Sequence, residues 1–492
     1  VNKSGDLEGP VDETNRLTYR EFSEKIDNVS SALYHRYGVR KGDRVAIMLK
    51  NVVEYLLSFF ASAKIGAIVV PLNTALKGEE MDFQVKDSGA SILITDSEFH
   101  ELIADVTANI PAVRHIITTG EPIKGTIPFP ILLSKGRPLP EIPLNEMDSA
   151  IIMYTSGTTG RPKGAVLTHK NVIASAMNSA SICELQPERD KMLVIVPLFH
   201  VTGLGLAMCS AVFAGIPIVL MKKYKTADML KVIAKERITA MFAVPTILWL
   251  MLNAPELAKY DLSCLHSFGA GGGAAPEELM LLCAQKLPGL ELMPGYGLSE
   301  TVAGVVSTTS LKEALTNLGT VGRPLPLVDI RIVDISGKNV PQGEPGEILI
   351  RGCQVMKEYW NNPQATRETL VDGWLHTSDI GKVTEDGYIY ILDRTKDMIN
   401  RGGEKIYSLE VENLLYRHPK VLEAAVVGVP DVIFGEQVKT AIVLKLGERA
   451  TAEEIQEYCG KYLSYYKVPK YVEFRETLPR NPAGKVIKSK LR

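Results

Sequence analysis

Hydrophobic and polar residues follow two different periods along the first part of the chain. A capping-box spacing from Thr18 to Glu21 precedes apolar residues at helical spacing, which predicts a helix that ends near Gly38. Short apolar runs and helical patterns then alternate, with strands at 44–49, 67–70 and 91–95 and helices at 52–64 and 79–86. Because these strands are apolar on both faces, the pattern predicts a parallel sheet covered by helices on both sides.

The pattern changes twice further along the chain. Apolar strands continue at 151–154, 192–196, 216–221 and 238–242, and from about residue 317 short strands joined by turns follow at 329–333, 347–351, 381–384 and 388–392. After a charged stretch at 393–397, the patterns predict helices at 409–416 and 452–463 and strands at 422–427 and 439–446. The sequence therefore predicts an α/β protein. Its large N-terminal domain of parallel α/β sheets spans 1–394, with a small, mostly antiparallel β subdomain at about 317–394, and a smaller α+β C-terminal domain spans 395–492.

Composition and charge exclude several classes of partner. The 55 basic and 57 acidic residues leave a net charge of −2, which gives no support for nucleic acid or an anionic membrane as the main partner. No apolar run reaches the ~18 residues that span a bilayer. Six cysteines without a CxxC pair fit neither zinc nor a disulfide framework, so we expect a reduced, cytoplasmic compartment. The first residue is Val1, which leaves open whether a natural N-terminus and a targeting segment are missing.

A segment rich in glycine and hydroxyl groups follows the strand at 151–154. Residues 155–164 read Thr-Ser-Gly-Thr-Thr-Gly-Arg-Pro-Lys-Gly. Glycines let backbone N–H groups approach an anion, hydroxyls donate further hydrogen bonds, and Lys163 adds positive charge. The spacing is not that of a P-loop, because no Gly-Lys-Ser/Thr is present. On composition alone, an anion-binding loop and a flexible polar turn both remain open.

Other candidate residues are weaker when each is taken alone. The small residues at 269–275 would let backbone approach a flat ligand, or would form a loop that leads into a helix with Pro276 at its first position. Asp379 could accept hydrogen bonds from both hydroxyls of a diol. His200 fits a satisfied histidine at a strand end, and Lys485 lies within a basic C-terminal stretch.

Taken together, these strings resemble one family. Residues 155–164 are similar to the signature of the adenylate-forming superfamily, which includes acyl-CoA synthetases, luciferases and peptide-synthetase adenylation domains. Further motifs follow in the order of that family, from Leu17-Thr18-Tyr19 to Lys485, so the resemblance covers essentially the whole chain. Two positions depart from the family pattern: Ser299 stands where threonine is more frequent, and Ser378 where glycine is commoner.

The resemblance implies a role for each motif. It implies that ATP phosphates bind at Thr155, Ser156, Gly157, Thr158, Thr159 and Lys163, that adenine and the acyl group bind along Gly271, Gly272, Gly273, Ala274, Tyr296 and Gly297, and that the ribose binds at Asp379 and Arg394. Ser299 would contact the α-phosphate, Glu300 would hold Mg²⁺, and His200 would be a gate or carboxylate contact at the mouth of the acyl pocket. Lys485 would bind the reacting oxygens, and Gly402 and Gly403 would line the tunnel for coenzyme A.

The implied activity is that of an acyl-CoA synthetase. A small-molecule carboxylic acid, fatty or aromatic, would be converted to acyl-AMP and then to a thioester of coenzyme A, while the C-terminal domain moves as a lid about Lys396. A stand-alone adenylation protein that loads a carrier-protein thiol, a luciferase-type monooxygenase and a non-catalytic nucleotide-binding protein remain as alternatives. The sequence leaves open the acyl group, a weak peripheral membrane contact, and the choice between a monomer and a homodimer.

Overall fold

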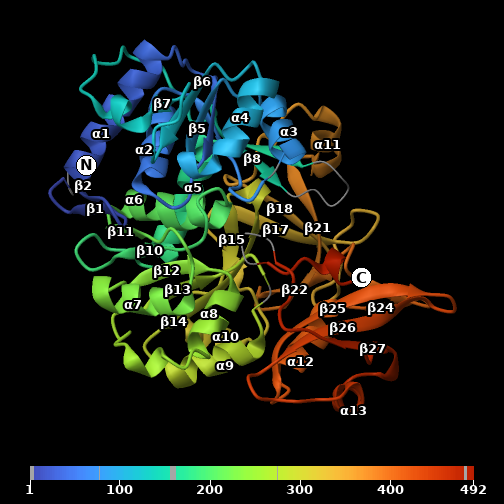
Figure 1. Ribbon diagram of the computed structural model, residues 1–492. Helices are drawn as coiled ribbons and strands as arrows, with labels where there is room; N and C mark the ends of the chain where they lie inside the picture. Colours follow the sequence, from blue (N-terminus) through green and yellow to red (C-terminus); the bar gives the residue numbers. More distant parts are fainter. Residues whose placement is uncertain (1–4, 77, 156–161, 274, 481–484) are drawn as a thin grey trace.

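Four sheets organise the protein (Figure 1). The computed structural model describes residues 5–76, 78–155, 162–273, 275–480 and 485–492, and the strands of these residues make up the four sheets. Two large sheets lie in the N-terminal domain, a third sheet follows them, and the fourth belongs to the C-terminal domain. The predicted fold class is confirmed.

The first sheet carries most of the strands that lead to the candidate site. In spatial order its strands are β16 (Arg323–Pro324), β15 (Ala303–Ser307), β14 (Glu291–Leu298), β13 (Ser267–Ala270), β12 (Ala240–Ala243), β10 (Met192–Val194), β11 (Ile218–Leu220), β1 (Glu8–Val11) and β2 (Arg16–Thr18). The pairs from β14 to β1 are parallel, and the outer pairs are antiparallel. The carboxyl ends of β12, β13 and β14 therefore meet at one edge, where open α/β sheets place their ligands.

The second sheet has a parallel centre and an antiparallel margin. Its order is β19 (Glu358–Tyr359), β9 (Lys163–Thr168), β8 (Ser149–Thr155), β4 (Ile68–Pro71), β3 (Arg44–Met48), β5 (Ile92–Asp96), β6 (His115–Thr119) and β7 (Ile127–Pro128). Strand β19 pairs antiparallel with β9, although its sequence lies within the predicted β subdomain. That segment therefore returns to the N-terminal sheets instead of staying with the third sheet.

Helices cover both faces of the two large sheets. They are α1 (Tyr19–Ser31), α2 (Val53–Lys64), α3 (Gly78–Ser88), α4 (His100–Asn109), α5 (His169–Ile182), α6 (Ser210–Ala214), α7 (Thr226–Glu236), α8 (Pro245–Leu252), α9 (Glu277–Lys286), α10 (Leu311–Thr316) and α11 (Pro363–Thr369). Along β3, Val45 and Ile47 join the core shared with α1, α2 and the first sheet, whereas Ala46 and Met48 pack in the core that includes α3 and α4. This alternation is the predicted burial of both strand faces.

The prediction of the first helix is confirmed, whereas the predicted position of Pro276 at the start of α9 is wrong. Thr18 Oγ1 accepts a hydrogen bond from Glu21 N at 3.2 Å, and Glu21 Oε2 accepts from Thr18 N at 2.8 Å, so the capping box is present. Pro276 is the N-cap of α9 and not its first residue, because its ψ of 144° is extended. Among the described residues, no helix is both long and apolar enough to span a membrane.

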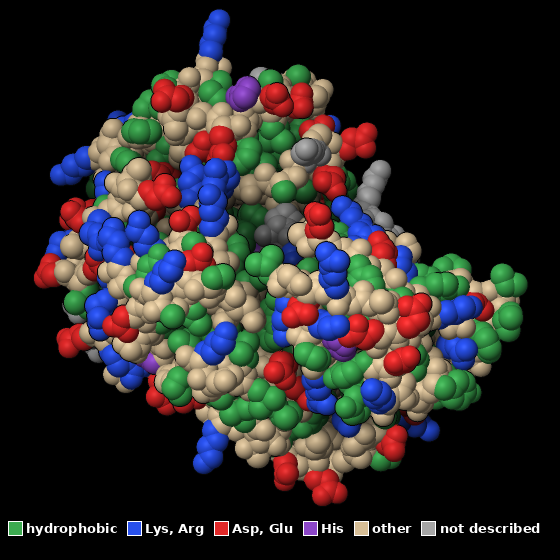
Figure 2. Space-filling model, turned by 60° about the horizontal axis from the view of Figure 1, so that its bottom comes forward, with side chains coloured by type: hydrophobic (Ala, Val, Ile, Leu, Met, Phe, Trp, Pro, Cys, Tyr) green, Lys and Arg blue, Asp and Glu red, His purple; other side chains and the backbone are tan. Residues whose placement is uncertain are grey.

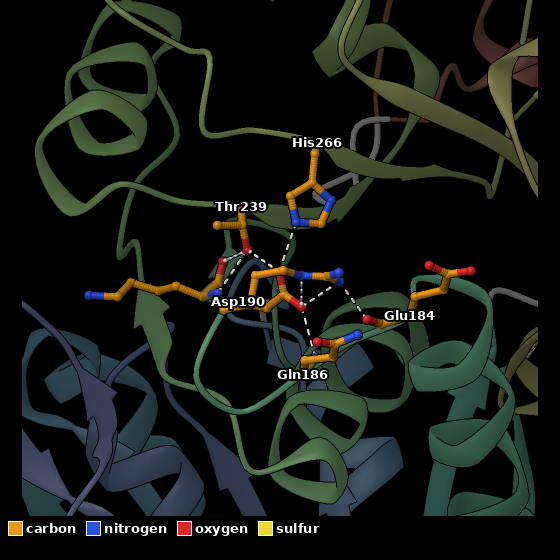
Figure 3. Close-up of polar contacts among 7 residues, drawn as sticks. Glu184, Gln186, Asp190, Thr239 and His266 are labelled. Carbon is orange, nitrogen blue, oxygen red and sulfur yellow. Dashed lines mark hydrogen bonds and ion pairs between the residues drawn. The ribbon is translucent and has the colours of Figure 1, made fainter.

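The buried carboxylate of Asp190 connects three strands of the first sheet, β10, β12 and β13, at their amino ends (Figure 3). Asp190, just before β10, accepts hydrogen bonds from Thr239 Oγ1 at 3.0 Å and lies 2.8 Å from His266 Nε2. Thr239 and His266 immediately precede β12 and β13. Arg189 and the backbone N–H of Gln186 also donate to Asp190, at 2.9 and 2.7 Å. The network fixes these strands at the edge opposite the candidate site.

The third and fourth sheets are mainly antiparallel. The third contains β17 (Val328–Val333), β18 (Gly346–Gly352), β21 (Trp374–Val383), β20 (Leu370–Val371) and β22 (Ile389–Arg394). The fourth contains β24 (Glu404–Ile406), β23 (Ile399–Arg401), β26 (Gly435–Leu444), β25 (Val421–Asp431) and β27 (Tyr471–Phe474), with helices α12 (Ser408–Tyr416) and α13 (Ala452–Tyr462). Between these sheets the chain turns, and Asp397 N and Met398 N both donate to Arg394 O at 2.9 Å.

The C-terminal domain packs beside α8 and α9 of the large domain (Figure 1). Arg417 forms an ion pair with Glu277, and the rings of Tyr416 and Trp249 meet edge-to-face with centroids 5.8 Å apart. Arg480 donates to Thr246 Oγ1 at 3.3 Å. These contacts hold the C-terminal end of the chain against the ligand edge of the first sheet.

Candidate active site

The glycines after β13 form one wall of the site. Gly272 has a φ of +80°, a conformation that L side chains rarely adopt. A Cβ atom at Gly272 would lie 3.1 Å from Lys485 Cε and 3.8 Å from Val244 Cγ1. The side chain of Lys485 therefore lies directly against this backbone. The structure brings together residues more than 200 positions apart in the sequence.

The buried carboxylate of Asp379 forms a second part of the site. Asp379 on β21 is 3% exposed and accepts a hydrogen bond from Tyr296 Oη at 2.6 Å. Arg394 Nε lies 3.1 Å from the other carboxylate oxygen, because Asp379 and Arg394 are partners in the β21–β22 register. Burial raises the pKa of Asp379, against the opposing effects of Arg394, Tyr296 and Lys485. This carboxylate is an acceptor with cationic and phenolic neighbours.

The residue before Asp379 lies within strand β21, at an irregularity of its pairing with β18, and adopts the conformation that glycine would favour. Ser378 has a φ of +58°. Glu347 supports it, with Oε1 accepting from Ser378 N at 3.0 Å and Oε2 lying 3.0 Å from His376 Nδ1. Strand β21 begins at Trp374, earlier than the predicted strand at 381–384. The departure from the family pattern at Ser378 is therefore accommodated by a side chain from the neighbouring strand.

Glu300 lies in a short helical turn, η6 (Ser299–Thr301), that also holds Ser299. Its Oε1 accepts a hydrogen bond from Tyr359 Oη at 2.8 Å. Lys163 Nζ, at the start of β9, is 5.2 Å from the centroid of the Tyr359 ring. Burial and the adjacent carboxylate raise the pKa of Tyr359, so its hydroxyl remains the donor. Tyr359 is not among the site residues predicted from the sequence, since a lone tyrosine in a turn-rich segment has no distinguishing pattern.

Burial and neighbouring charges shift the pKa values of two other predicted site residues, Lys485 and His200. Burial, with a further contribution from Arg394, lowers the pKa of Lys485 to about 8, while Asp379 and Glu300 act in the opposite direction. Burial and the charge of Lys485 lower the pKa of His200 to about 3, so its imidazole is neutral at neutral pH. His200 Nδ1 lies 3.4 Å from Thr202 N, which leaves Nε2 as the nitrogen that carries the proton.

Gly402 and Gly403 lie apart from this group of residues. They form the turn between β23 and β24, with φ values of +61° and +97°. Gly402 N donates to Phe434 O at 2.8 Å, within the C-terminal domain itself. The adjacent residues Val432 and Ile433 are 104% and 82% exposed, and hydrophobic side chains are visible on the lobe that projects to the right in Figure 2. The structure therefore places Lys485, and not the glycine turn, at the site.

Part of the predicted phosphate loop is described. Thr155 ends β8, and its Oγ1 donates to Lys163 O at 3.4 Å. Gly271 and Gly273 flank Gly272 after β13, and Gly297 continues β14 beyond Tyr296. The remaining predicted ligands, Ser156, Gly157, Thr158, Thr159 and Ala274, lie outside the described residues.

The residues present suit a magnesium–nucleotide complex. Lys163, Arg394 and Lys485 carry positive charges that could meet phosphates, and Asp379 is an acceptor that could meet hydroxyl groups. Within the described ranges, no group of three or more His, Cys, Asp or Glu side chains could hold a metal ion. Mg²⁺ is commonly bound through one or two carboxylates together with substrate phosphates and water, and Glu300 fits that arrangement.

Comparison with known proteins gives matches over nearly the whole chain. The family model of AMP-binding enzymes matches residues 1–360, and that of the AMP-binding enzyme C-terminal domain matches residues 410–485. A feruloyl-CoA synthase of Amycolatopsis sp is 38% identical over 480 residues, 97% of this chain and 93% of the relative. A long-chain-fatty-acid–CoA ligase of Mycobacterium tuberculosis is 36% identical over 485 residues, again 97% and 93%. The crystal structure of an anthranilate CoA ligase with anthranoyl-AMP has a TM-score of 0.94 and 29% identity, covering 100% of this chain and 94% of that one.

Proposed function

The chain belongs to the AMP-binding enzymes, among the adenylate-forming acid–thiol ligases, and on this premise we propose that it converts a fatty or aromatic carboxylic acid into its coenzyme A thioester. ATP and the acid first give acyl-AMP and pyrophosphate, and the thiol of coenzyme A then displaces AMP. The proposal rests on the position of Lys485 against Gly272, beside Asp379, Arg394 and Glu300.

In the first reaction, a carboxylate oxygen of the acid attacks the α-phosphorus of ATP and the bond to pyrophosphate breaks. Lys485 neutralises the negative charge that builds on the reacting oxygens, which is worth most in a buried site. Asp379 accepts from the ribose hydroxyls, and Arg394 beside it contacts the ribose or a phosphate. Tyr296 and Gly297 meet the adenine, and Ser299 contacts the α-phosphate. Mg²⁺, held by Glu300 and the phosphates, would supply further neutralisation of charge.

In the second reaction, the thiol sulfur attacks the acyl carbon and AMP leaves. Gly402 and Gly403 would then line the thiol's path in place of Lys485. This exchange requires the C-terminal domain, which we assign to 395–492, to rotate about the turn that contains Lys396. Within this turn Asp397 N and Met398 N donate to Arg394 O, and Thr395 N donates to Ser378 O of the large domain, which is consistent with a pivot that follows Thr395.

The experiment is a panel of carboxylic acids in the ATP–pyrophosphate exchange assay, followed by detection of free acyl-CoA. Feruloyl-type and fatty acids are the first acids to test, because relatives that act on them are more than a third identical to this chain. Exchange with release of free acyl-CoA supports the proposal. Exchange with acyl transfer only to a carrier-protein thiol would favour the alternative of a stand-alone adenylation protein. ATP binding without exchange for any acid would refute both.

A further inference from the structure

Tyr359 contacts two predicted ligands that come from different sheets. It belongs to β19, and its side chain is 7% exposed. Its backbone pairs with Ala165 on β9, directly after the predicted phosphate-binding segment 155–164. Its hydroxyl donates to Glu300 Oε1 at 2.8 Å, and its ring lies 5.2 Å from Lys163 Nζ. One side chain therefore spans the distance between the expected phosphate ligand and the expected magnesium ligand.

Hydrogen bonds hold this tyrosine firmly in place. Tyr359 N donates to Thr366 Oγ1 at 2.9 Å, and the next residue, Trp360, donates its N–H to Gly164 O at 2.7 Å. Met356 N donates to the backbone carbonyl of Glu300 at 2.7 Å. The segment 356–360 thus ties the turn that holds Glu300 to β9 through backbone bonds, and the Tyr359 hydroxyl adds the side-chain contact that sets the carboxylate.

On the basis of the proposed function, we propose that Tyr359 is a positioning residue that orients the Glu300 carboxylate toward magnesium and couples it to Lys163. The Tyr359 hydroxyl donates to Oε1 of Glu300. Among the described residues no hydrogen-bond partner is present at Oε2 of Glu300, which leaves this oxygen for the cation. A hydrogen bond to one oxygen of a metal-binding carboxylate fixes its orientation, and loss of such a partner usually costs 10- to 100-fold in metal affinity. The ring face independently attracts the ammonium of Lys163.

The test compares Tyr359→Phe with Tyr19→Phe. Both substitutions remove one buried tyrosine hydroxyl, and Tyr19, the first residue of α1, donates its hydroxyl to the backbone carbonyl of Ile216 at 2.6 Å. Calorimetry measures ATP binding at increasing Mg²⁺, and also without metal. For Tyr359→Phe, we expect the Mg²⁺ concentration that gives half of the effect to rise by about tenfold or more. Metal-free ATP affinity should stay within about twofold because the ring that faces Lys163 is retained. High Mg²⁺ should restore acyl-AMP formation. Tyr19→Phe should leave the Mg²⁺ requirement unchanged.

A second pair of variants shows whether Tyr359 acts through Glu300. In a Glu300→Gln background, Tyr359→Phe should add little further loss of Mg²⁺ response, because the carboxylate that it orients is gone. Full additivity of the two losses, or an unchanged Mg²⁺ requirement in Tyr359→Phe alone, would overturn the role. If wild-type protein showed no Mg²⁺-dependent ATP binding at all, the proposed function would fail together with this inference. A normal wild type with an unaffected variant would overturn the inference only.

Discussion

The lowered pKa of Lys485 predicts how adenylate formation depends on pH. Charge neutralisation requires the ammonium form, and with a pKa of about 8 this form makes up about 90% of the free enzyme at pH 7 and about 10% at pH 9. Because the charged form is the active one, the rate should fall as pH rises through 8. We therefore expect kcat/KM for ATP to decrease about tenfold per pH unit above that value.

Neighbouring charges determine where this decrease occurs. The bound triphosphate is an anion that favours the ammonium, so the alkaline decrease in kcat should lie at higher pH than the decrease in kcat/KM. Arg394 lowers the pKa of Lys485, so Arg394→Gln should move the decrease in kcat/KM to higher pH. Lys485→Arg stays charged throughout and should lose the alkaline decrease, although its absolute rate will be lower because a planar guanidinium differs in shape from an ammonium.

The assay is ATP–pyrophosphate exchange from pH 6 to 10, with thioester formation from pre-made acyl-AMP as the control reaction. Lys485→Ala should slow exchange by about 10²- to 10³-fold, the usual effect of removing one charged transition-state contact, and should spare the control reaction. An alkaline decrease that persists in Lys485→Arg would refute the reasoning. So would a Lys485→Ala variant that slows both half-reactions equally.

Three further substitutions test the rest of the site. Lys396→Pro fixes φ and should keep pyrophosphate exchange within about tenfold while thioester formation falls much further; Lys396→Ala is the control, and equal effects on both steps would place the pivot elsewhere. Gly272→Ala forces a Cβ to 3.1 Å from Lys485 Cε at a φ of +80°, and should slow exchange about tenfold through ~1–2 kcal/mol of strain; an unchanged exchange rate would contradict this packing. Asp379→Asn should reduce the preference for ATP over 2′-deoxy-ATP by about 10-fold, measured as the ratio of kcat/KM values; an unaltered ratio would show that this carboxylate does not read the ribose.

Sequence patterns predicted those elements whose formation depends on neighbouring residues. The capping box at Thr18 and the two-sided strand at 44–49 follow from local periodicity, and both are present in the structure. The position of β19 could not be predicted, because a two-residue strand has no period and its pairing with β9 depends on tertiary packing. The same packing brings Tyr359 to Glu300. Spacing along the chain contains no information on that contact, since 59 residues separate the two.

The conformation at Ser378 was equally hidden. A serine at a φ of +58° departs from the local preference, and its support comes from Glu347, 31 residues away. The grouping of Lys485 with Gly272 was accessible only through the resemblance to a family, because these residues belong to different domains. The sequence shows which chemical groups are present, whereas the distances between these groups depend on how the sheets pack.

The Asp190 network has a consequence for how such a protein can change over evolutionary time. It secures β10, β12 and β13 at their amino ends, and two groups of residues expected at the acyl pocket, His200 and the glycines 271–273, follow the carboxyl ends of β10 and β13. The contacts that stabilise these strands and the residues expected to select the acid therefore lie at opposite ends of the strands. Substitutions near Gly273, where the resemblance implies that the acyl group binds, would change the pocket while the anchorage at Asp190 stays intact. A protein divided in this way can gain activity toward new carboxylic acids through substitutions at the carboxyl ends of its strands, while the contacts at the amino ends keep it folded.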